Sequence, residues 1–261
     1  MFTSKMTRRT PAVSAASADT AGAVAIRAES ISAGYGQVPV LHEVDIEVRP
    51  GEVVALLGAN GSGKTTTLMV LAGELMPTSG SVRFLGSTTR DPLHVRAKNG
   101  LRLISEDRSV LMSLTVLDNL RLALDDVEPA LTLFPELRPL LKRRVGLLSG
   151  GEQQMLTLAR ALVSEARVLL VDELSLGLAP LIVKRLLAAV RAAADNGLAV
   201  LLVEQQIQNA LAVSDRAYVL KHGRVVMQGR ASDLRGRMSE IEASYLADMP
   251  TDTNVRKEVT S

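Results

Sequence analysis

The chain of 261 residues contains no cysteine and no tryptophan, and its aromatic residues are three tyrosines and three phenylalanines. Without cysteine the chain has no disulfide, no thiolate nucleophile and no Cys-based metal site. So few aromatic rings leave little surface on which nucleic-acid bases could stack. The 30 Lys and Arg residues nearly balance the 28 Asp and Glu residues, and a net charge of +2 provides no strongly basic surface for phosphate backbones. We therefore expect no nucleic-acid partner.

The sequence also lacks an uncharged apolar run of the roughly 18 residues that a bilayer-spanning helix requires. Any role at a membrane would therefore need a partner that spans it. The hydrophobic content of 47% can fill the core of one large domain or of a domain with an insert. Residues 1–25 begin with basic side chains, but proline, serines and Asp19 interrupt the apolar stretch that a secretion signal needs, so a disordered leader is expected. The polar residues 247–261 are expected to form a loose tail.

Apolar and polar residues alternate along 26–33 and 43–48, as in half-buried strands, whereas 53–57 is continuously apolar, as in a strand covered on both faces. Further strands are expected at 81–86, 101–105, 167–173 and 198–203, helices at 64–75, 181–194 and 205–213, and a hairpin at 217–229. Strands that alternate with helices predict a mostly parallel sheet flanked by helices. We expect one domain over 26–246, with a helical subdomain of about 93–162 inserted in its core.

The segment GANGSGKTTTL at 58–68 matches G-x-x-x-x-G-K-[ST] and lies between an expected strand and an expected helix. Its glycines let backbone N–H groups converge on phosphate oxygens, and the helix N-terminus adds a positive end. Lys64 is expected to reach the outer phosphates, and the Thr65 hydroxyl to hold magnesium. A flexible glycine-rich turn is the alternative interpretation. The residues expected to contact the nucleotide are Gly58, Asn60, Gly61, Ser62, Gly63, Lys64, Thr65 and Thr66.

The apolar segment RVLLVDE at 167–173 ends in two carboxylates. Asp172, at the carboxyl end of this expected strand, is placed to bind magnesium directly or through water, and Glu173 to polarise an attacking water. The two carboxylates could instead cap the next helix. With the phosphate loop present, we expect ATP and Mg²⁺ as the cofactors.

The segment LLSGGEQQMLTLARAL at 147–162 contains Ser149 followed three residues later by Glu152, which predicts a capping box at the start of a helix. Gly150 and Gly151 leave the backbone amides of this helix start open to an anion. Both interpretations can hold together. Because the phosphate loop already supplies one helix N-terminus, the second one suggests service to the nucleotide of another subunit.

In these three segments the sequence resembles the ATP-binding subunits of ABC transporters, over about residues 26–246 and in the order typical of that family. The resemblance implies a P-loop NTPase core with an N-terminal antiparallel β region and an inserted helical subdomain. It further implies a dimer in which each ATP lies between the phosphate loop of one subunit and Ser149, Gly150 and Gly151 of the other. Tyr35, in SAGYGQ, resembles the aromatic residue that stacks on adenine; otherwise it is a turn residue.

Finer features resemble the branch that imports branched-chain amino acids and related amides or urea, in SLGLAP at 175–180, VEQQIQNAL at 203–211 and SEDRSVLMSLTVLDNL at 105–120. Leu174 and Ser105 depart from this branch, because proline is usual at both positions, and Leu111 stands where an aromatic residue is common. These departures weaken the inference about cargo but not the inference of an ATPase. The resemblance implies a second ATPase subunit, identical or paralogous, two permease chains, an extracytoplasmic solute receptor, and a peripheral location on the cytoplasmic face of the plasma membrane.

Two residues stand where the family usually has others. Glu106 replaces a glutamine that touches magnesium, and a carboxylate is the better ligand, although Glu106 could also be a solvated loop acid. Gln205 replaces a histidine that helps to place the attacking water; glutamine can donate a similar hydrogen bond but cannot take up a proton. We therefore expect Glu173 to activate the water and Gln205 to orient it, while the adjacent Glu204 faces away from the phosphate.

The leading hypothesis is the energy-coupling ATPase of an importer. A non-hydrolysing nucleotide-binding subunit, marked by Gln205 and Glu106, is one alternative. A soluble ABC ATPase that works on DNA or the ribosome is another, although the long coiled-coil insertion or second ATPase copy typical of that class is absent from the sequence.

Overall fold

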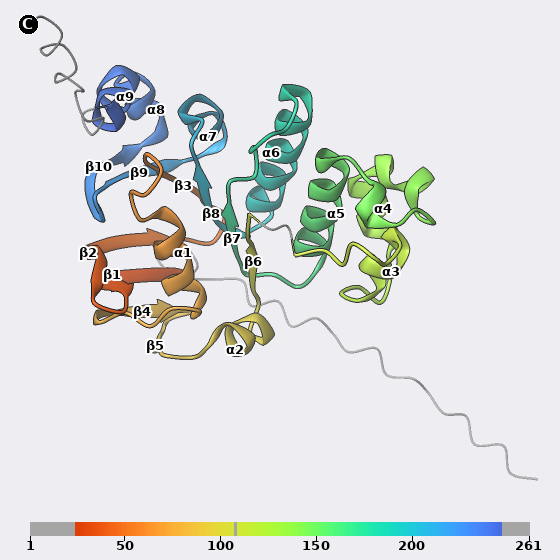
Figure 1. The fold of residues 1–261 in the computed structure, drawn as a ribbon, viewed down its shortest axis with the longest axis horizontal. Coiled ribbons are helices and arrows are strands. Elements are labelled where there is room, and N and C mark those ends of the chain that lie inside the picture. The colour runs from red at the N-terminus through yellow and green to blue at the C-terminus, as the bar shows by residue number, and fades with distance from the viewer. Residues whose placement is uncertain (1–23, 107–108, 247–261) are drawn as a thin grey trace, which may run out of the picture.

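The computed structural model describes residues 24–106 and 109–246. Nearly all of the expected leader, all of the expected tail, and Asp107 and Arg108 lie outside these described residues. Two sheets and their flanking helices make up the described part of the chain (Figure 1). No helix within these ranges combines the length and the apolar character that crossing a bilayer requires.

The strands are β1 (Ile26–Tyr35), β2 (Val38–Val48), β3 (Val53–Leu57), β4 (Ser79–Phe84), β5 (Ser87–Thr89), β6 (Leu101–Ile104), β7 (Val168–Asp172), β8 (Ala199–Glu204), β9 (Arg216–Lys221) and β10 (Arg224–Arg230). The α-helices are α1 (Lys64–Ala72), α2 (Leu93–Lys98), α3 (Val116–Arg121), α4 (Glu128–Leu133), α5 (Gly150–Val163), α6 (Pro180–Asp195), α7 (Ile207–Val213), α8 (Ala231–Arg235) and α9 (Met238–Leu246). Two 3-10 helices, η1 (Pro135–Leu140) and η2 (Val145–Leu147), connect α4 to α5.

The first sheet is antiparallel and has the strand order β2-β1-β4-β5. Along β1 buried residues alternate with more exposed ones, because one face of this sheet packs on the core and the other meets solvent. This sheet confirms the expected N-terminal antiparallel region.

The second sheet has the order β10-β9-β3-β8-β7-β6, and only β10 at its edge runs antiparallel to its neighbour. Every residue of β3, β7 and β8 is buried. Successive side chains of a strand point to opposite faces, so Val200 and Leu202 pack with α5 and α6 while Leu201 and Val203 pack with α1 and the antiparallel sheet. The predicted mostly parallel sheet covered on both faces is confirmed.

The helices α3, α4 and α5 gather around Phe134 and Leu156 and are separated in Figure 1 from α1 and the antiparallel sheet. The buried Asn119 organises their start: its side chain accepts from the Leu111 N–H at 2.9 Å and donates to the carbonyls of Leu111 and Thr115, both at 3.0 Å. Within the range expected for the inserted subdomain, β6 is a strand of the parallel sheet, paired with β7. The helical part therefore follows β6 along the chain.

The helix that carries the phosphate loop is closed at its other end by a buried arginine. Arg96 is 2% exposed, and its Nη1 donates to the carbonyls of Leu71 at 2.5 Å and Val70 at 3.2 Å, while its Nε donates to the carbonyl of Asp91 at 2.8 Å. The last carbonyls of a helix lack partners within the helix and carry partial negative charge, so a cation stabilises them. Arg96 thus ties the C-terminal end of α1 to the segment before α2.

Arg96→Met is expected to lower the free energy of unfolding by about 1.5–3 kcal/mol, because buried carbonyls lose their bonds to a charged group. Urea unfolding monitored by circular dichroism measures this change. Arg83→Met, at an exposed arginine of β4, is the matched control and should change stability by less than about 0.5 kcal/mol. Equal effects of the two substitutions would contradict the capping role.

Candidate active site

The loop between β3 and α1 has a backbone that only glycine fits at several positions. Gly61 and Gly63 have φ angles of +78° and +104°, in the left-handed region that other residues rarely adopt. A Cβ on Gly58 would lie 2.4 Å from Ser62 Oγ and 2.5 Å from the carbonyl oxygen of Leu220. The tight loop thus places its backbone at the carboxyl end of β3, where α1 begins.

A cavity of about 570 Å³ opens beside this loop. Side chains from five separate segments meet there, although the sequence spreads them over 170 positions from residue 35 to residue 205. The residues expected at the site that line the cavity are Tyr35, Asn60, Gly61, Gly63, Lys64, Thr65, Thr66, Glu106, Glu173 and Gln205. Val40 and Leu176 also line it and were not expected, because nothing in their local sequence distinguishes them from ordinary apolar residues.

Lys64 and Thr65 hold the loop and the neighbouring carboxylate. Lys64 Nζ donates to the carbonyls of Gly58 at 2.8 Å and Ala59 at 2.9 Å. Burial lowers the pKa of Lys64, and Glu173 and Asp172 oppose that change. Thr65 Oγ1 donates to Asp172 Oδ2 at 2.8 Å. The cation and the hydroxyl of this helix start therefore both lie next to the place where β7 ends.

Asp172 has one carboxylate oxygen to spare. Its side chain is 5% exposed, and among the described residues Oδ1 has no hydrogen-bond partner. Burial raises the pKa of Asp172; the Thr65 hydroxyl opposes this rise, and Glu173 and Glu106 add to it. A buried oxygen without a partner costs free energy unless a ligand satisfies it.

This donor set fits magnesium, which prefers oxygen ligands and usually takes one or two carboxylates together with water and substrate phosphates. The described residues include no cluster of three or more His, Cys, Asp and Glu side chains that could hold a metal by themselves. Asp172 and Thr65, with Glu106 across the cavity, would therefore share the ion with the phosphates of a nucleotide.

Glu173 lies in a conformation that is rare for a residue with a side chain. Its φ is +49°, a strain of about 1–3 kcal/mol that persists only where the surroundings enforce it. Its N–H donates to the carbonyl of Val203 at 3.0 Å, and Gln205 Nε2 donates to its Oε1 at 2.6 Å. The amide of Gln205 thus fixes one carboxylate oxygen of Glu173 within the cavity.

Ser62 and Tyr35 differ in how they meet the cavity. Tyr35 lines the main cavity and is 50% exposed. Its hydroxyl contacts Met69 Sδ at 3.2 Å. Ser62, in contrast, lines a separate cavity behind the loop, and its N–H donates to the carbonyl of Ala59 at 3.2 Å. A nucleotide contact from Ser62 stays a prediction, because Ser62 is not among the described residues that line the main cavity.

The start of α5 does not meet the phosphate loop of the same chain. Ser149 caps the helix: its N–H and Oγ donate to Glu152 Oε2 at 2.7 Å and 2.9 Å, and the Glu152 N–H donates back to Ser149 Oγ at 3.3 Å. The described lining of the cavity includes neither Ser149 nor Gly150 nor Gly151. α5 packs beside α3 and α4, apart from α1 (Figure 1). A Cβ on Gly151 would lie 3.0 Å from Ile182, so this glycine also allows α5 to approach α6.

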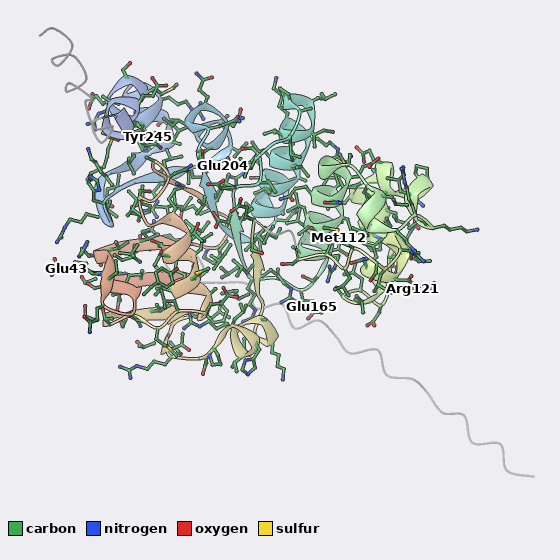
Figure 2. All side chains as sticks on the ribbon, in the orientation of Figure 1. Glu43, Met112, Arg121, Glu165, Glu204 and Tyr245 are labelled. Carbon is green, nitrogen blue, oxygen red and sulfur yellow. The ribbon has the colours of Figure 1, made fainter. Side chains whose placement is uncertain are left out.

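Glu204 is buried, although it stands at the end of β8, where the polar residues Gln205 and Gln206 follow. It lies within the body of the molecule, whereas Glu43 and Arg121 lie at its edges (Figure 2). Glu204 is absent from the described lining of the main cavity, and its carboxylate instead accepts hydrogen bonds from Ser175. Sequence reasoning missed the contact with Ser175, because the two residues lie 29 positions apart.

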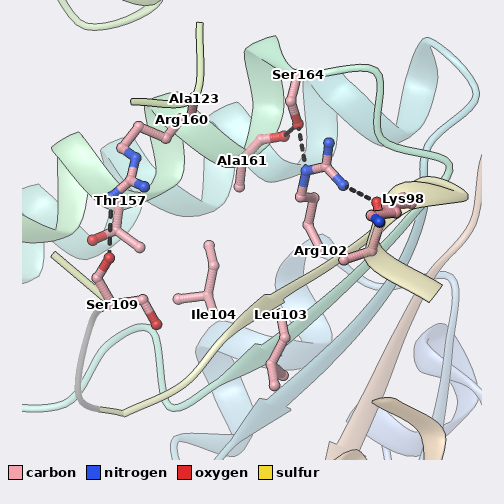
Figure 3. A pocket seen from close by; sticks show the side chains of 11 residues that line it. Lys98, Arg102, Leu103, Ile104, Ser109, Ala123, Thr157, Arg160, Ala161 and Ser164 are labelled. Carbon is pink, nitrogen blue, oxygen red and sulfur yellow. Dashed lines mark hydrogen bonds between the residues drawn. The ribbon is translucent and has the colours of Figure 1, made fainter. Parts of the chain in front are cut away.

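A further cavity, of about 480 Å³, lies between β6 and α5 (Figure 3). Lys98, Arg102 and Arg160 line it, and its described lining contains no acidic side chain. Arg160 Nη1 donates to the carbonyl of Ser109 at 3.0 Å, and Arg160 Nε is buried with no partner among the described residues. This basic cavity therefore borders Ser109, three residues after Glu106.

Known proteins resemble this chain in sequence and in fold. A family model described as ABC transporter matches residues 41–175. The chain is 41% identical over 216 residues to the high-affinity branched-chain amino acid transport ATP-binding protein BraG of Pseudomonas aeruginosa, covering 79% of this chain and 93% of that protein. It is 39% identical over 221 residues to the probable branched-chain amino acid transport ATP-binding protein LivF of Archaeoglobus fulgidus, covering 80% and 93%. A solved nucleotide-free ATP-binding cassette from an ABC transporter superposes with a TM-score of 0.76 at 25% identity, covering 85% of this chain and 98% of that one.

Asp172→Asn is expected to raise the free energy of unfolding of the ligand-free protein by about 0.5–2 kcal/mol. The amide removes a buried charge that lies near Glu173 and Glu106, and its oxygen can still accept from Thr65. In thermal melts the same variant should lose the stabilisation that ATP with Mg²⁺ gives the parent. Asp195→Asn, at an exposed residue of α6, is the control and should change neither quantity. A ligand-free Asp172→Asn protein that melts below the parent would contradict this account.

Proposed function

The chain belongs to the ABC transporter family, and from this membership we propose that it couples ATP hydrolysis to uptake of branched-chain amino acids or related small polar solutes. The observation that carries the proposal is one cavity in which the phosphate loop, Glu173 and Gln205 meet. Asp172 lies next to it, bound to the Thr65 hydroxyl. The two relatives named for branched-chain amino acid transport support the cargo, since the match covers 93% of each.

In the proposed mechanism the phosphate loop and its helix start bind the nucleotide. Lys64 Nζ exchanges its two loop carbonyls for outer phosphate oxygens, and Tyr35 stacks on adenine at the cavity edge. Thr65, Asp172 and Glu106 would provide oxygens for magnesium, which would neutralise charge that builds up on the phosphates. Asp172 Oδ1, which has no partner among the described residues, supports this assignment, because a ligand there would satisfy it.

Glu173 accepts the proton of the attacking water, and Gln205 orients the carboxylate that does so. Gln205 cannot take up a proton itself, since an amide has no basic atom at neutral pH. Its hydrogen bond to Glu173 Oε1 leaves Oε2 of the same carboxylate to meet the water. With this division of roles the site can hydrolyse ATP without the usual histidine. The contact between Gln205 and Glu173 therefore favours a hydrolysing subunit over a non-hydrolysing one.

The start of α5 serves a second ATPase subunit, which is either another copy of this chain or a paralogue. Ser149, Gly150 and Gly151 lie away from the cavity of their own chain, and a capped helix N-terminus with small residues suits the phosphate of a partner's nucleotide. Closing of the two subunits on ATP would then move the helical part against the sheet.

The membrane partners are permease chains, with an extracytoplasmic solute receptor acting through them, so that this subunit sits peripherally on the cytoplasmic face. The basic cavity beside Ser109 supports contact with a permease there. Ser109, three residues after Glu106, lines it on one side and α5 lines it on the other, and in the proposed mechanism both Glu106 and α5 respond to nucleotide.

Glu173→Gln is expected to lower kcat for ATP hydrolysis by at least about 100-fold, because general-base catalysis is lost. Gln205→Ala should lower it by only about tenfold, the effect of one lost orienting hydrogen bond. Phosphate release by the assembled complex measures both, and equilibrium binding of ATP should stay within about twofold of the parent in each. The reverse ranking would overturn the assigned roles, and a parent complex that releases no phosphate would establish the non-hydrolysing alternative.

Cells that lack this chain are expected to lose most of their high-affinity uptake of radiolabelled leucine. A plasmid encoding the parent chain should restore uptake, and one encoding Lys64→Ala should not, because the variant loses its phosphate contact. Lys184→Ala, on the exposed face of α6, is the control and should restore it fully. Unchanged leucine uptake in the deletion strain would refute the proposed cargo while leaving the ATPase assignment intact.

A further inference from the structure

We propose that Glu204 is a positioning residue for hydrolysis: its buried carboxylate fixes the loop after β7 and thereby holds Glu173 in its working conformation. The inference rests on the proposed role of Glu173 and extends it to a residue outside the cavity. Glu204 ends β8, is 1% exposed, and lies in the interior of the molecule (Figure 2). A carboxylate is rarely buried so completely unless specific donors hold it.

Both oxygens of this carboxylate bind the same residue of the neighbouring loop. The Ser175 N–H donates to Glu204 Oε1 at 3.0 Å, and Ser175 Oγ donates to Oε2 at 2.5 Å. Ser175 is itself buried, so water does not compete for these bonds. Burial raises the pKa of Glu204, and the two Ser175 donors oppose that rise. The pair therefore joins the end of β8 to the loop two residues beyond Glu173.

Three consecutive residues at the end of β8 hold that loop at two of its residues, Glu173 and Ser175. The carbonyl of Val203 accepts from the Glu173 N–H at 3.0 Å, Glu204 binds Ser175, and Gln205 Nε2 donates to Glu173 Oε1 at 2.6 Å. Glu173 needs such support because its φ of +49° is unfavourable for a non-glycine residue. Without Glu204 these contacts would hold Glu173 itself but not the loop beyond it.

The same contact acts on the cavity wall. Leu176, next to Ser175, lines the cavity with Glu173, and its N–H donates to the carbonyl of Glu173 at 3.3 Å. The bond between Glu204 and Ser175 thus limits the position of both the carboxylate and the apolar side chain beside it. Loosening the loop should slow the chemical step without removing any group that contacts the nucleotide.

The test compares three variants of the full complex. Glu204→Met keeps the length of the side chain but removes both acceptors, and should lower kcat by about tenfold, with ATP affinity within about twofold of the parent. Glu204→Gln can still accept from the Ser175 N–H and donate to its Oγ, so it should stay within about threefold of the parent kcat. Ser175→Ala combined with Glu204→Met should be no slower than Glu204→Met alone, because both remove one interaction.

A carboxylate at the opposite end of the same sheet provides the control. Glu52 accepts from Arg216 Nε at 2.6 Å and from the Arg49 N–H at 3.0 Å, and it directly precedes β3, at the amino end of the parallel strands, whereas Glu173 follows the carboxyl end of β7. Glu52→Met should lower the melting temperature and leave kcat at the parent value. A Glu204→Met protein with the same pattern, less stable but fully active, would overturn the inference and leave Glu204 a purely structural residue.

The Glu173→Gln background separates this inference from the proposed function. There, adding Glu204→Met should change the residual single-turnover rate by less than about twofold, since the group it positions is gone. A further tenfold loss would show that Glu204 acts by another route and would refute the inference. If Glu173→Gln alone hydrolyses ATP at the parent rate, the proposed role of Glu173 fails; if only the Glu204 variants are without effect, this inference alone fails.

Discussion

The parallel pairing of β3, β8, β7 and β6 is the constraint on which the site depends. Leu57 pairs with Glu204, and Asp172 pairs with Val203, so these strands end at almost the same level. Their carboxyl ends share one edge of the sheet, the edge at which ligands of open α/β sheets bind. The phosphate loop, Asp172 at the end of β7, Glu173 directly after it, Gln205 after β8 and Glu106 after β6 all lie at this edge.

The same edge carries the least favourable features of the molecule. Asp172 has a buried oxygen without a partner among the described residues, Glu173 has a positive φ, and Lys64 keeps a buried ammonium close to both. Each feature lowers stability in the absence of a ligand, and each is used once a nucleotide and magnesium arrive. Local rules that a protein breaks at one place usually mark its functional site. The buried apolar strands and the capped end of α1 offset this cost elsewhere.

The mechanism also explains why the replacement of a common histidine need not stop hydrolysis. A histidine at position 205 could both donate a hydrogen bond and take up a proton, whereas glutamine can only donate. The structure places the amide of Gln205 against the carboxylate of Glu173, which is the stronger base of the two groups in the cavity.

The ATPase family that three short motifs predicted is confirmed by the relatives, and the names of these relatives narrow the proposed cargo.

By itself the sequence determined the features that depend on short stretches of chain. These features are the glycine spacing of the phosphate loop, the apolar segment that ends in Asp172 and Glu173, and the capping box at Ser149. Each is local, so residue types and their spacing predict it. The alternation of strands with helices along the chain predicts the parallel sheet. Only the tertiary structure decided that Glu204 binds Ser175, that Arg96 caps α1, and that Ser62 lines a second cavity behind the loop. These contacts join residues far apart along the chain, and strand pairing and helix packing bring them together; no local pattern specifies which distant side chain will fill a given place.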